Sequence, residues 1–457
     1  MKVTAREYQA YGDGKQKDTK AIQAAIDDCF QKGGGTVILE NGTYISGTLY
    51  LKDRVTLRIE ASARLLASPD IRDYGTDTHH NRYVNEKDMD RCFIYAQDAY
   101  EIGLEGDGEI NGNPDAFPNP GTSDRPMMIR FLRCRRIHVS GLKLYDAAAW
   151  TTAFLDSSEI WIHGLDIKNQ KHYNGDGLDF DGCRDVFVSG CRIDGTDDNL
   201  CLQAGNPAYP VQNIHIANCK FTSVCAGIRI GLKSIGTIRD VTVSNCTFHR
   251  IWREGIKLEC SEGGRIENCL FQNLIMRDVR RPVYMILNNR FCPENGSSVE
   301  LKEIPSIGEM AHIHFSNIQI TDTEEMGKTH HRFRKSLMGE PRFNGIRIDA
   351  NENHCIEDVS FSNVHYSGYG HVRQADIPES YPTVPDIKLD PSAMGRTWIS
   401  ENYYPDWSRT ACMDIRNVMG LRLTDVVFEL LHEDERPVYI LEHCGTEKED
   451  ITIRKRV

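Results

Sequence analysis

The stretch NGDGLDFDGCRDVFVSGCRIDGTDDNLCL, which runs from Asn174 to Leu202, decides the fold. It holds two acidic clusters, NGDG and GTDD, in which Asp176 precedes Asp197 by 21 residues. The flanking sequence repeats with nearly the same period, and a period of 20–50 residues is typical of stacked repeat architectures. Equivalent positions in successive repeats become neighbours in space. We therefore expect Asp176, Asp197 and Asp198 to lie on one face, on adjacent rungs.

The repeat consists of short apolar strands separated by small polar residues. Strands begin at Ile137, Ile160, Val186, Ile214 and Val241, with successive spacings of 23, 26, 28 and 27 residues. Later copies of the repeat begin at Ile313, Val359 and Leu421. Each copy carries one Gly, Asn or Asp, a series that we name the bend column: Gly141, Gly164, Gly190, Asn218, Asn245, Asn268, Asn317, Asn363 and Asp425. These residue types tolerate left-handed backbone angles, so the column predicts a tight bend in every repeat.

The next residue of each copy forms an apolar column: Leu142, Leu165, Cys191, Cys219, Cys246, Cys269, Ile318, Val364 and Val426. We expect these side chains to face inward and the cysteines to stack as small buried hydrophobes. Disulfides are the less favoured alternative, because side chains that point in parallel make poor disulfide geometry. Strands about 4.8 Å apart with short bends and no helices between them predict an all-β fold, a parallel β-helix of about ten coils.

The N-terminal region differs from the repeat. Residues 17–33 predict an amphipathic helix with Ile22, Ile26, Cys29 and Phe30 on one face, which would cap the open end of the solenoid. We expect a single domain over residues 1–457, because no linker separates a second one. Segments 289–312, 323–344 and 366–412 break the period and are predicted to be long loops.

Composition excludes several classes of protein. The 457 residues are 40% hydrophobic, and no run approaches the ~20 apolar residues of a membrane-spanning helix. The net charge of −12 argues against a nucleic-acid partner. The N-terminus has no apolar leader, and fifteen cysteines favour a reducing compartment, so we expect a cytoplasmic protein. The sequence does not reveal the oligomeric state.

The acidic clusters resemble those of glycoside hydrolase family 28, the polygalacturonase-like enzymes that degrade pectin. That family carries Asn-Thr-Asp-Gly, Asp-Asp, Gly-His-Gly and Arg-Ile-Lys. Here Asn174-Gly-Asp-Gly matches the first motif with glycine in place of threonine, and Asp197-Asp198 matches the second. Gly255-Ile-Lys257 matches the last motif without its arginine, and 225–231 lacks the histidine. The resemblance implies a right-handed β-helix and inverting hydrolysis, with Asp197 as the acid and Asp176 and Asp198 holding the water.

The chemistry of the residues agrees with this resemblance. Inverting hydrolysis needs a carboxylic acid and a carboxylate about 6.5–9.5 Å apart, which adjacent rungs can supply. Clustered carboxylates also favour retention of a proton by one of them. No cofactor or metal is required. The candidates for binding an oligosaccharide or polysaccharide substrate are Asn174, Lys257, Arg229, His172 and Trp150.

Each candidate has a structural alternative. Asp-Gly and Asp-Asp also occur as plain turn residues. Arg229 could form a surface ion pair, His172 could be a solvated loop residue, and Trp150 could be a core aromatic. Asp179 and Asp181 alternate with apolar residues, which predicts that they face solvent.

Two other functions remain open on the sequence. A β-helix polysaccharide lyase would use the aspartates to bind Ca²⁺ and Lys257 as the base. A non-catalytic glycan-binding β-helix would need no aspartate cluster. If the long loops wall off one end of the cleft, a hydrolase would act from chain ends on short galacturonan or rhamnogalacturonan fragments.

Overall fold

The computed structural model describes residues 1–78, 90–117, 125–289, 306–326, 345–351, 353–377 and 408–455. Their contacts divide into two units. The first holds Met1–Leu200 with Asn213–Cys219, and the second holds Cys201–Gln212 with Lys220–Val457. The prediction of a single domain stays a prediction.

Almost every element is a strand, and the pairs described run parallel. The elements are β1 (Lys2–Thr4), η1 (Ala5–Tyr8), β2 (Asp13–Lys17), α1 (Thr19–Gln31), β3 (Gly35–Leu39), β4 (Gly42–Ser46), β5 (Leu49–Tyr50), β6 (Val55–Ile59), β7 (Ala63–Ala67), η2 (Ile71–Asp73), η3 (Thr76–Thr78), β8 (Cys92–Gln97), β9 (Tyr100–Gly106), β10 (Glu109–Asn111), η5 (Pro114–Ala116), β11 (Met127–Leu132), β12 (Arg135–Ser140), β13 (Lys143–Tyr145), β14 (Thr152–Leu155), β15 (Ser158–His163), β16 (Asp166–Asn169), β17 (Leu178–Asp181), β18 (Arg184–Ser189), β19 (Arg192–Gly195), β20 (Leu200–Ala204), β21 (Val211–Ala217), β22 (Lys220–Ser223), β23 (Ile228–Ser234), β24 (Thr237–Ser244), β25 (Thr247–Cys260), β26 (Arg265–Leu287), β27 (Glu309–Thr321), β28 (Ile346–Ala350), β29 (Ile356–Gly368), η8 (Gln374–Asp376), β30 (Met413–Arg416), β31 (Val418–Leu430), β32 (Tyr439–Glu442) and β33 (Gly445–Lys455).

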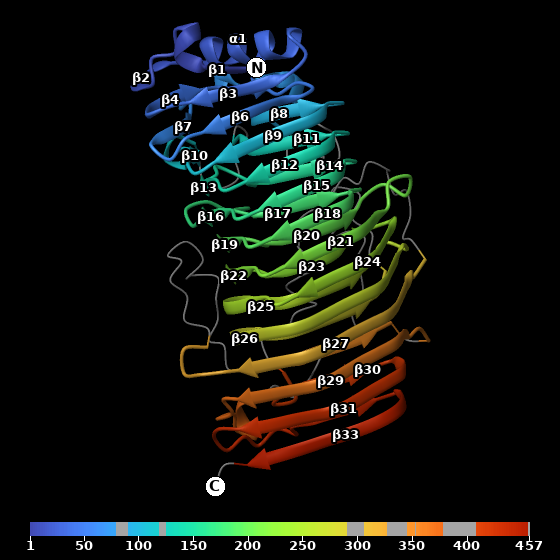
Figure 1. Cartoon of the computed structure of the whole chain (residues 1–457). Helices are drawn as coiled ribbons and strands as arrows, with labels where there is room; N and C mark the ends of the chain where they lie inside the picture. Colours follow the sequence, from blue (N-terminus) through green and yellow to red (C-terminus); the bar gives the residue numbers. More distant parts are fainter. Residues whose placement is uncertain are drawn as a thin grey trace, which may run out of the picture. The chain divides into compact units, whose positions relative to one another are not determined.

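In the first unit the strands stack in the predicted register. Ile137 pairs with Ile160, and Ile160 pairs with Val186, all three fully buried. The stack has eight strands, of which successive members lie side by side in Figure 1: β1, β3, β6, β9, β12, β15, β18 and β21. Parallel strands joined without intervening helices make a right-handed parallel β-helix, which confirms the predicted fold class.

The second unit has the same kind of strand stack, but its register differs from the predicted one. Its stack has six strands: β24, β26, β27, β29, β31 and β33. The two stacks together exceed the predicted ten coils or so. Cys269 pairs with Val241 and Ile313, so it does not belong to the apolar column, where Leu274 pairs with Ile318.

The bend column has the same correction. Asn273, rather than Asn268, follows Asn245, and side-chain hydrogen bonds of 3.1, 3.0 and 2.8 Å link Asn245, Asn273, Asn317 and Asn363 in turn. All four have φ between 52° and 56°, the left-handed conformation that the sequence predicts.

The cysteines are reduced throughout the described residues, where fourteen are free. Cys191 and Cys219 are both buried and neighbour each other in the first unit, and the interaction of the two thiols together with burial raises the pKa of Cys191. This agrees with a role as small buried hydrophobes rather than reactive thiols.

Helix α1 covers thirteen residues of the predicted 17–33. Ile22, Ala25, Ile26 and Cys29 are buried at helical spacing, and the helix packs against β3 (Figure 1). Phe30 is instead 40% exposed and lies under the Lys52 ammonium, so it was wrongly placed on the buried face. That α1 caps the solenoid stays a prediction.

Two of the three predicted loops were too long, because strands enter them. Strand β27 begins at Glu309, inside the predicted loop 289–312, and β29 continues to Gly368, inside 366–412. Most of 323–344 lies outside the described residues. Within the described part of the chain, no helix has the length and apolar character needed to cross a membrane.

Candidate active site

The turn that carries Asp176 is fixed by its backbone. Asn174 has φ 54°, in the left-handed region, and Gly175 N–H donates to Thr196 Oγ1 at 3.2 Å. The Asp176 carbonyl accepts bonds from Thr151 N–H at 3.1 Å and from Thr151 Oγ1 at 2.6 Å. The direction of the turn is therefore set by both neighbouring rungs.

The second acidic cluster is joined to the first by main-chain bonds. Gly177 N–H donates to the Asp198 carbonyl at 3.0 Å, and Leu178 N–H donates to the Asn199 carbonyl at 2.9 Å. A Cβ on Gly177 would overlap the Asn199 carbonyl, so only glycine permits this approach.

These contacts bring the three predicted catalytic aspartates together. Carboxylate oxygens of Asp176 and Asp198 lie within 4.8 Å of one another, as do those of Asp197 and Asp198. Asp176 and Asp198 are 3% and 1% exposed, whereas Asp197 is only half-buried. Of the three, Asp197 is the most accessible to a molecule from solution.

The same carboxylates could hold a cation. Asp176 with Asp198, or Asp197 with Asp198, offers two oxygen ligands. Ca²⁺ takes six to eight oxygens, so further ligands would have to complete such a site. That no metal is needed stays a prediction.

The expectation that Asp179 and Asp181 face solvent was wrong. All four residues of β17 are buried, and Asp179 and Asp181 are 2% and 1% exposed. Phe180 stacks on Phe154 in the interior, so the two aspartates occupy the opposite, outward face of the strand. Two further buried carboxyl groups therefore follow directly after Asp176 in the chain.

His172 is buried rather than solvated. It is 5% exposed, and its Nε2 lies 2.9 Å from the Pro114 carbonyl. A carbonyl only accepts, so Nε2 carries the proton. Burial, together with the nearby Arg125 cation, lowers the pKa of His172 below its usual value. The lowered pKa favours the neutral imidazole of His172 at neutral pH.

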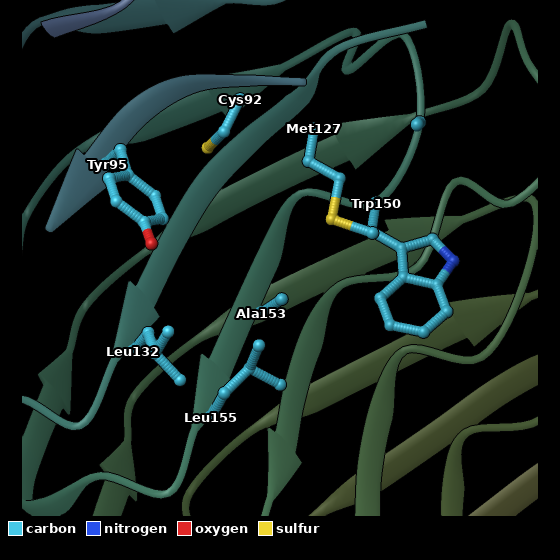
Figure 2. Packing of buried hydrophobic residues seen from close by; sticks show 8 residues of the cluster. Cys92, Tyr95, Met127, Leu132, Trp150, Ala153 and Leu155 are labelled. Carbon is cyan, nitrogen blue, oxygen red and sulfur yellow. The ribbon is translucent and has the colours of Figure 1, made fainter. Parts of the chain in front are cut away.

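Trp150 packs in an apolar cluster of the first unit, and Figure 2 shows the Met127 side chain directed toward it. It is 4% exposed. The other members of the cluster are Cys92, Tyr95, Leu132, Ala149, Ala153 and Leu155. This is the core packing that the sequence left open as an alternative. That Trp150 contacts a sugar stays a prediction.

Arg229 and Lys257 belong to the second unit and are register partners on β23 and β25. They are 9% and 5% exposed, so Arg229 is not a surface residue. Lys257 Nζ lies 3.0 Å from Glu259 Oε2, and Arg229 Nη2 lies 3.6 Å from Cys201 Sγ. Two buried cations thus lie side by side on adjacent rungs.

A buried ion pair between Arg281 and Glu254, which lies near Lys257 on β25, was not predicted from the sequence. Arg281 Nη1 lies 2.8 Å from Glu254 Oε1, and the Glu254 side chain is fully buried. The partners come from different rungs, 27 residues apart. No sequence motif marks them, and only the register of β25 with β26 reveals the pair.

Comparison with known proteins decides the family. The model of the family described as glycosyl hydrolases family 28 matches residues 43–329. The chain belongs to this family.

Its relatives in family 28 are distant. A polygalacturonase of Persea americana is 23% identical over 66% of this chain and 66% of its own length, so the chain spans just under two thirds of that relative. An exo-poly-alpha-D-galacturonosidase of Dickeya chrysanthemi is 20% identical over 85% of this chain and 74% of its length. The solved family 28 exopolygalacturonase of Yersinia enterocolitica superposes with a TM-score of 0.65 at 18% identity, covering 100% of this chain and 79% of that one.

Two departures from the family 28 pattern have steric causes. A Cβ on Gly175 would overlap the Thr196 hydroxyl, which explains the glycine in place of the family threonine. A Cβ on Gly255 would lie 2.7 Å from the Pro282 carbonyl, so no arginine fits there. Within 225–231, the segment that lacks the family histidine, Ala226 is fully buried.

Proposed function

We propose that this chain is an inverting glycoside hydrolase that needs no metal and removes sugars from the ends of pectin-derived oligosaccharides. The observation that carries the proposal is the grouping of Asp176 and Asp197 around Asp198, each within 4.8 Å of it. Membership of family 28 supports the inverting reaction class. The separation of the Asp197 and Asp198 carboxylates, at most 4.8 Å, is shorter than the about 6.5–9.5 Å of a typical inverting pair, so the family and not this distance carries the stereochemical assignment. The exo-acting relative of Dickeya chrysanthemi supports attack at chain ends.

Each aspartate takes one role in this reaction. Asp197, the most accessible of the three, protonates the glycosidic oxygen as the bond to the anomeric carbon breaks. Asp176 and Asp198 hold a water on the other face of the sugar and accept its proton as it attacks. The product leaves with inverted configuration, and the reaction consumes one water for each bond cleaved.

Buried cations suit an acidic sugar. Arg229 and Lys257 would bind the carboxylate of a galacturonate unit, because charge-assisted bonds are strong where water is excluded. Asn174, His172 and Trp150 remain candidates for binding other parts of the substrate. The substrate is therefore a galacturonan or rhamnogalacturonan fragment rather than a neutral glycan.

The compartment fits short substrates. We place the protein in the cytoplasm, where imported oligosaccharides are available and polymers are not. Fourteen free cysteines among the described residues are compatible with a reducing environment. Fractionation of the native host tests this placement, and recovery of the protein from the medium would contradict it.

The catalytic test is substitution of Asp197 by asparagine, which keeps size but cannot donate the acid proton. We expect the rate on pectic oligosaccharides to fall by about 10²–10⁴-fold. Asp185→Asn is the matched control, because Asp185 is a bend residue whose left-handed φ asparagine also tolerates. Near-full activity of Asp197→Asn, with loss on chelation, would instead support the Ca²⁺-dependent lyase.

Product analysis separates the remaining alternatives. A hydrolase releases reducing ends only, whereas a lyase also creates unsaturated ends that absorb ultraviolet light. Release of one small product from fragments, with little action on polymer, is expected for exo-attack. A rapid fall in polymer viscosity would show endo-attack, and absence of any cleavage would favour a glycan-binding role.

A further inference from the structure

Four consecutive residues, 171–174, lead into the turn of Asp176, and each is held by a contact from outside the turn. Lys171 Nζ lies 3.0 Å from Asp115 Oδ2, and His172 Nε2 lies 2.9 Å from the Pro114 carbonyl. Both partners belong to η5. The remaining two residues are held by a single side chain, that of Arg125.

Among the described residues, the two terminal nitrogens of Arg125 donate to three oxygens. Nη1 donates to the Tyr173 carbonyl at 2.9 Å and to the Ala148 carbonyl at 3.4 Å. Nη2 donates to Asn174 Oδ1 at 3.0 Å. The residue is 2% exposed, so water competes little for these bonds.

We infer that Arg125 is a positioning residue, one that holds Asn174 in its left-handed conformation and thereby aims Asp176. The inference rests on the proposed function. An asparagine at φ 54° is in a sparsely populated region and stays there only when its surroundings hold it. The planar guanidinium fixes the side chain and the preceding carbonyl of this turn at the same time. Arg125 touches no reacting atom in the proposed reaction.

The inference predicts a specific kinetic signature. Arg125→Gln should lower kcat by about 10²-fold and leave KM within about threefold, because a shift of about 1 Å in a catalytic group costs that much. Arg125→Lys keeps the positive charge but lacks the two terminal nitrogens of the planar guanidinium. Its kcat should therefore fall nearly as far. Retention of full kcat by Arg125→Lys would show that charge, not geometry, is what matters.

A second variant tests the same contact from the other side. Asn174→Gly removes the acceptor, while glycine still adopts the left-handed angle. If Asn174 acts through Arg125, the losses in kcat of Asn174→Gly and Arg125→Gln should be strongly non-additive in the double variant. Additive losses would overturn the inference. Arg133→Gln is the control, because Arg133 forms an exposed pair with Asp98 in the same unit.

Amide hydrogen exchange provides a readout that does not need activity. Arg125→Gln should raise exchange in peptides covering residues 172–178 and leave peptides from β27 unchanged. If the wild type cleaves no pectic fragment, the proposed function fails, and exchange alone decides the positioning role. Unchanged exchange at 172–178, or kcat within twofold of wild type in an active enzyme, would overturn it.

Discussion

Breaking the buried Arg281–Glu254 pair should destabilise the second unit far more than breaking an exposed ion pair would. Glu254 is fully buried, and Arg281 is 6% exposed. Arg281→Met leaves the Glu254 charge buried, and Arg253 still lies near it, with its Nε 3.7 Å from Glu254 Oε2. Removing one partner of a buried pair costs about 3–5 kcal/mol.

Two structural details adjust this magnitude. The partial compensation by Arg253 moves the cost toward the lower bound, about 3 kcal/mol. The Arg281 guanidinium also lies 5.8 Å from the Tyr284 ring, a cation–π contact of about 0.5–1 kcal/mol that is lost as well. We therefore expect Arg281→Met to cost about 3–4 kcal/mol.

A double-mutant cycle with urea denaturation measures the effect. The single variants Arg281→Met and Glu254→Leu should each be strongly destabilised, and the double variant should recover most of the loss, because paired burial of apolar groups is often neutral. Arg373→Met is the control, since the Arg373 side chain is 75% exposed beside Asp376 and should cost less than about 0.5 kcal/mol. A cost below 1 kcal/mol for Arg281→Met, or additive single losses, would refute this reasoning.

Three further changes test packing, ionisation and the turn. Phe154→Ala should cost about 3–5 kcal/mol by thermal denaturation, since the ring is 1% exposed and stacks on Phe180 at 5.1 Å; a loss below 1 kcal/mol would contradict this. Because the pKa of His172 is lowered in the folded protein, this histidine takes up a proton at a higher pH in the unfolded chain than in the folded one. Wild type should therefore lose stability below about pH 6.5, and His172→Gln should lose less between pH 7.5 and 5.5 in urea titrations; equal losses would count against it. Gly175→Thr should reduce the activity, and adding Thr196→Gly in a double variant should partly restore it. Unchanged activity of Gly175→Thr would contradict the steric explanation.

The bends were predictable because they depend on single residues. Gly, Asn and Asp adopt left-handed angles more readily than other residues, so their recurrence marks the bends directly. The one slip, Asn268 for Asn273, has a physical reason. Asn268 belongs to a second left-handed column, where it donates to Asp240 Oδ1 at 3.1 Å. Two columns five residues apart cannot be told apart by spacing alone.

The outward face of β17 could not be predicted from alternation. A strand that alternates Asp with Leu or Phe normally has one wet face, and that rule placed Asp179 and Asp181 in solvent. Their burial depends on what covers the strand, which is a tertiary property. The same limitation hid the Arg281–Glu254 pair, whose partners meet only through the register of two rungs.

Departures from a motif in a solenoid have to be interpreted together with the residue one rung away. Gly175 leaves no room for a side chain because Thr196, 21 residues later, occupies that space. Gly255 is confined in the same way by the Pro282 carbonyl, 27 residues later. In each case the substitution is a steric consequence of the neighbouring rung and does not by itself indicate lost chemistry. Asp176 and Asp198, whose carboxylate oxygens lie within 4.8 Å of one another, are joined through the main-chain bond from Gly177 N–H to the Asp198 carbonyl, and only glycine permits that approach. The placement of these two carboxylates therefore depends on Gly177, a residue that matches the family motif.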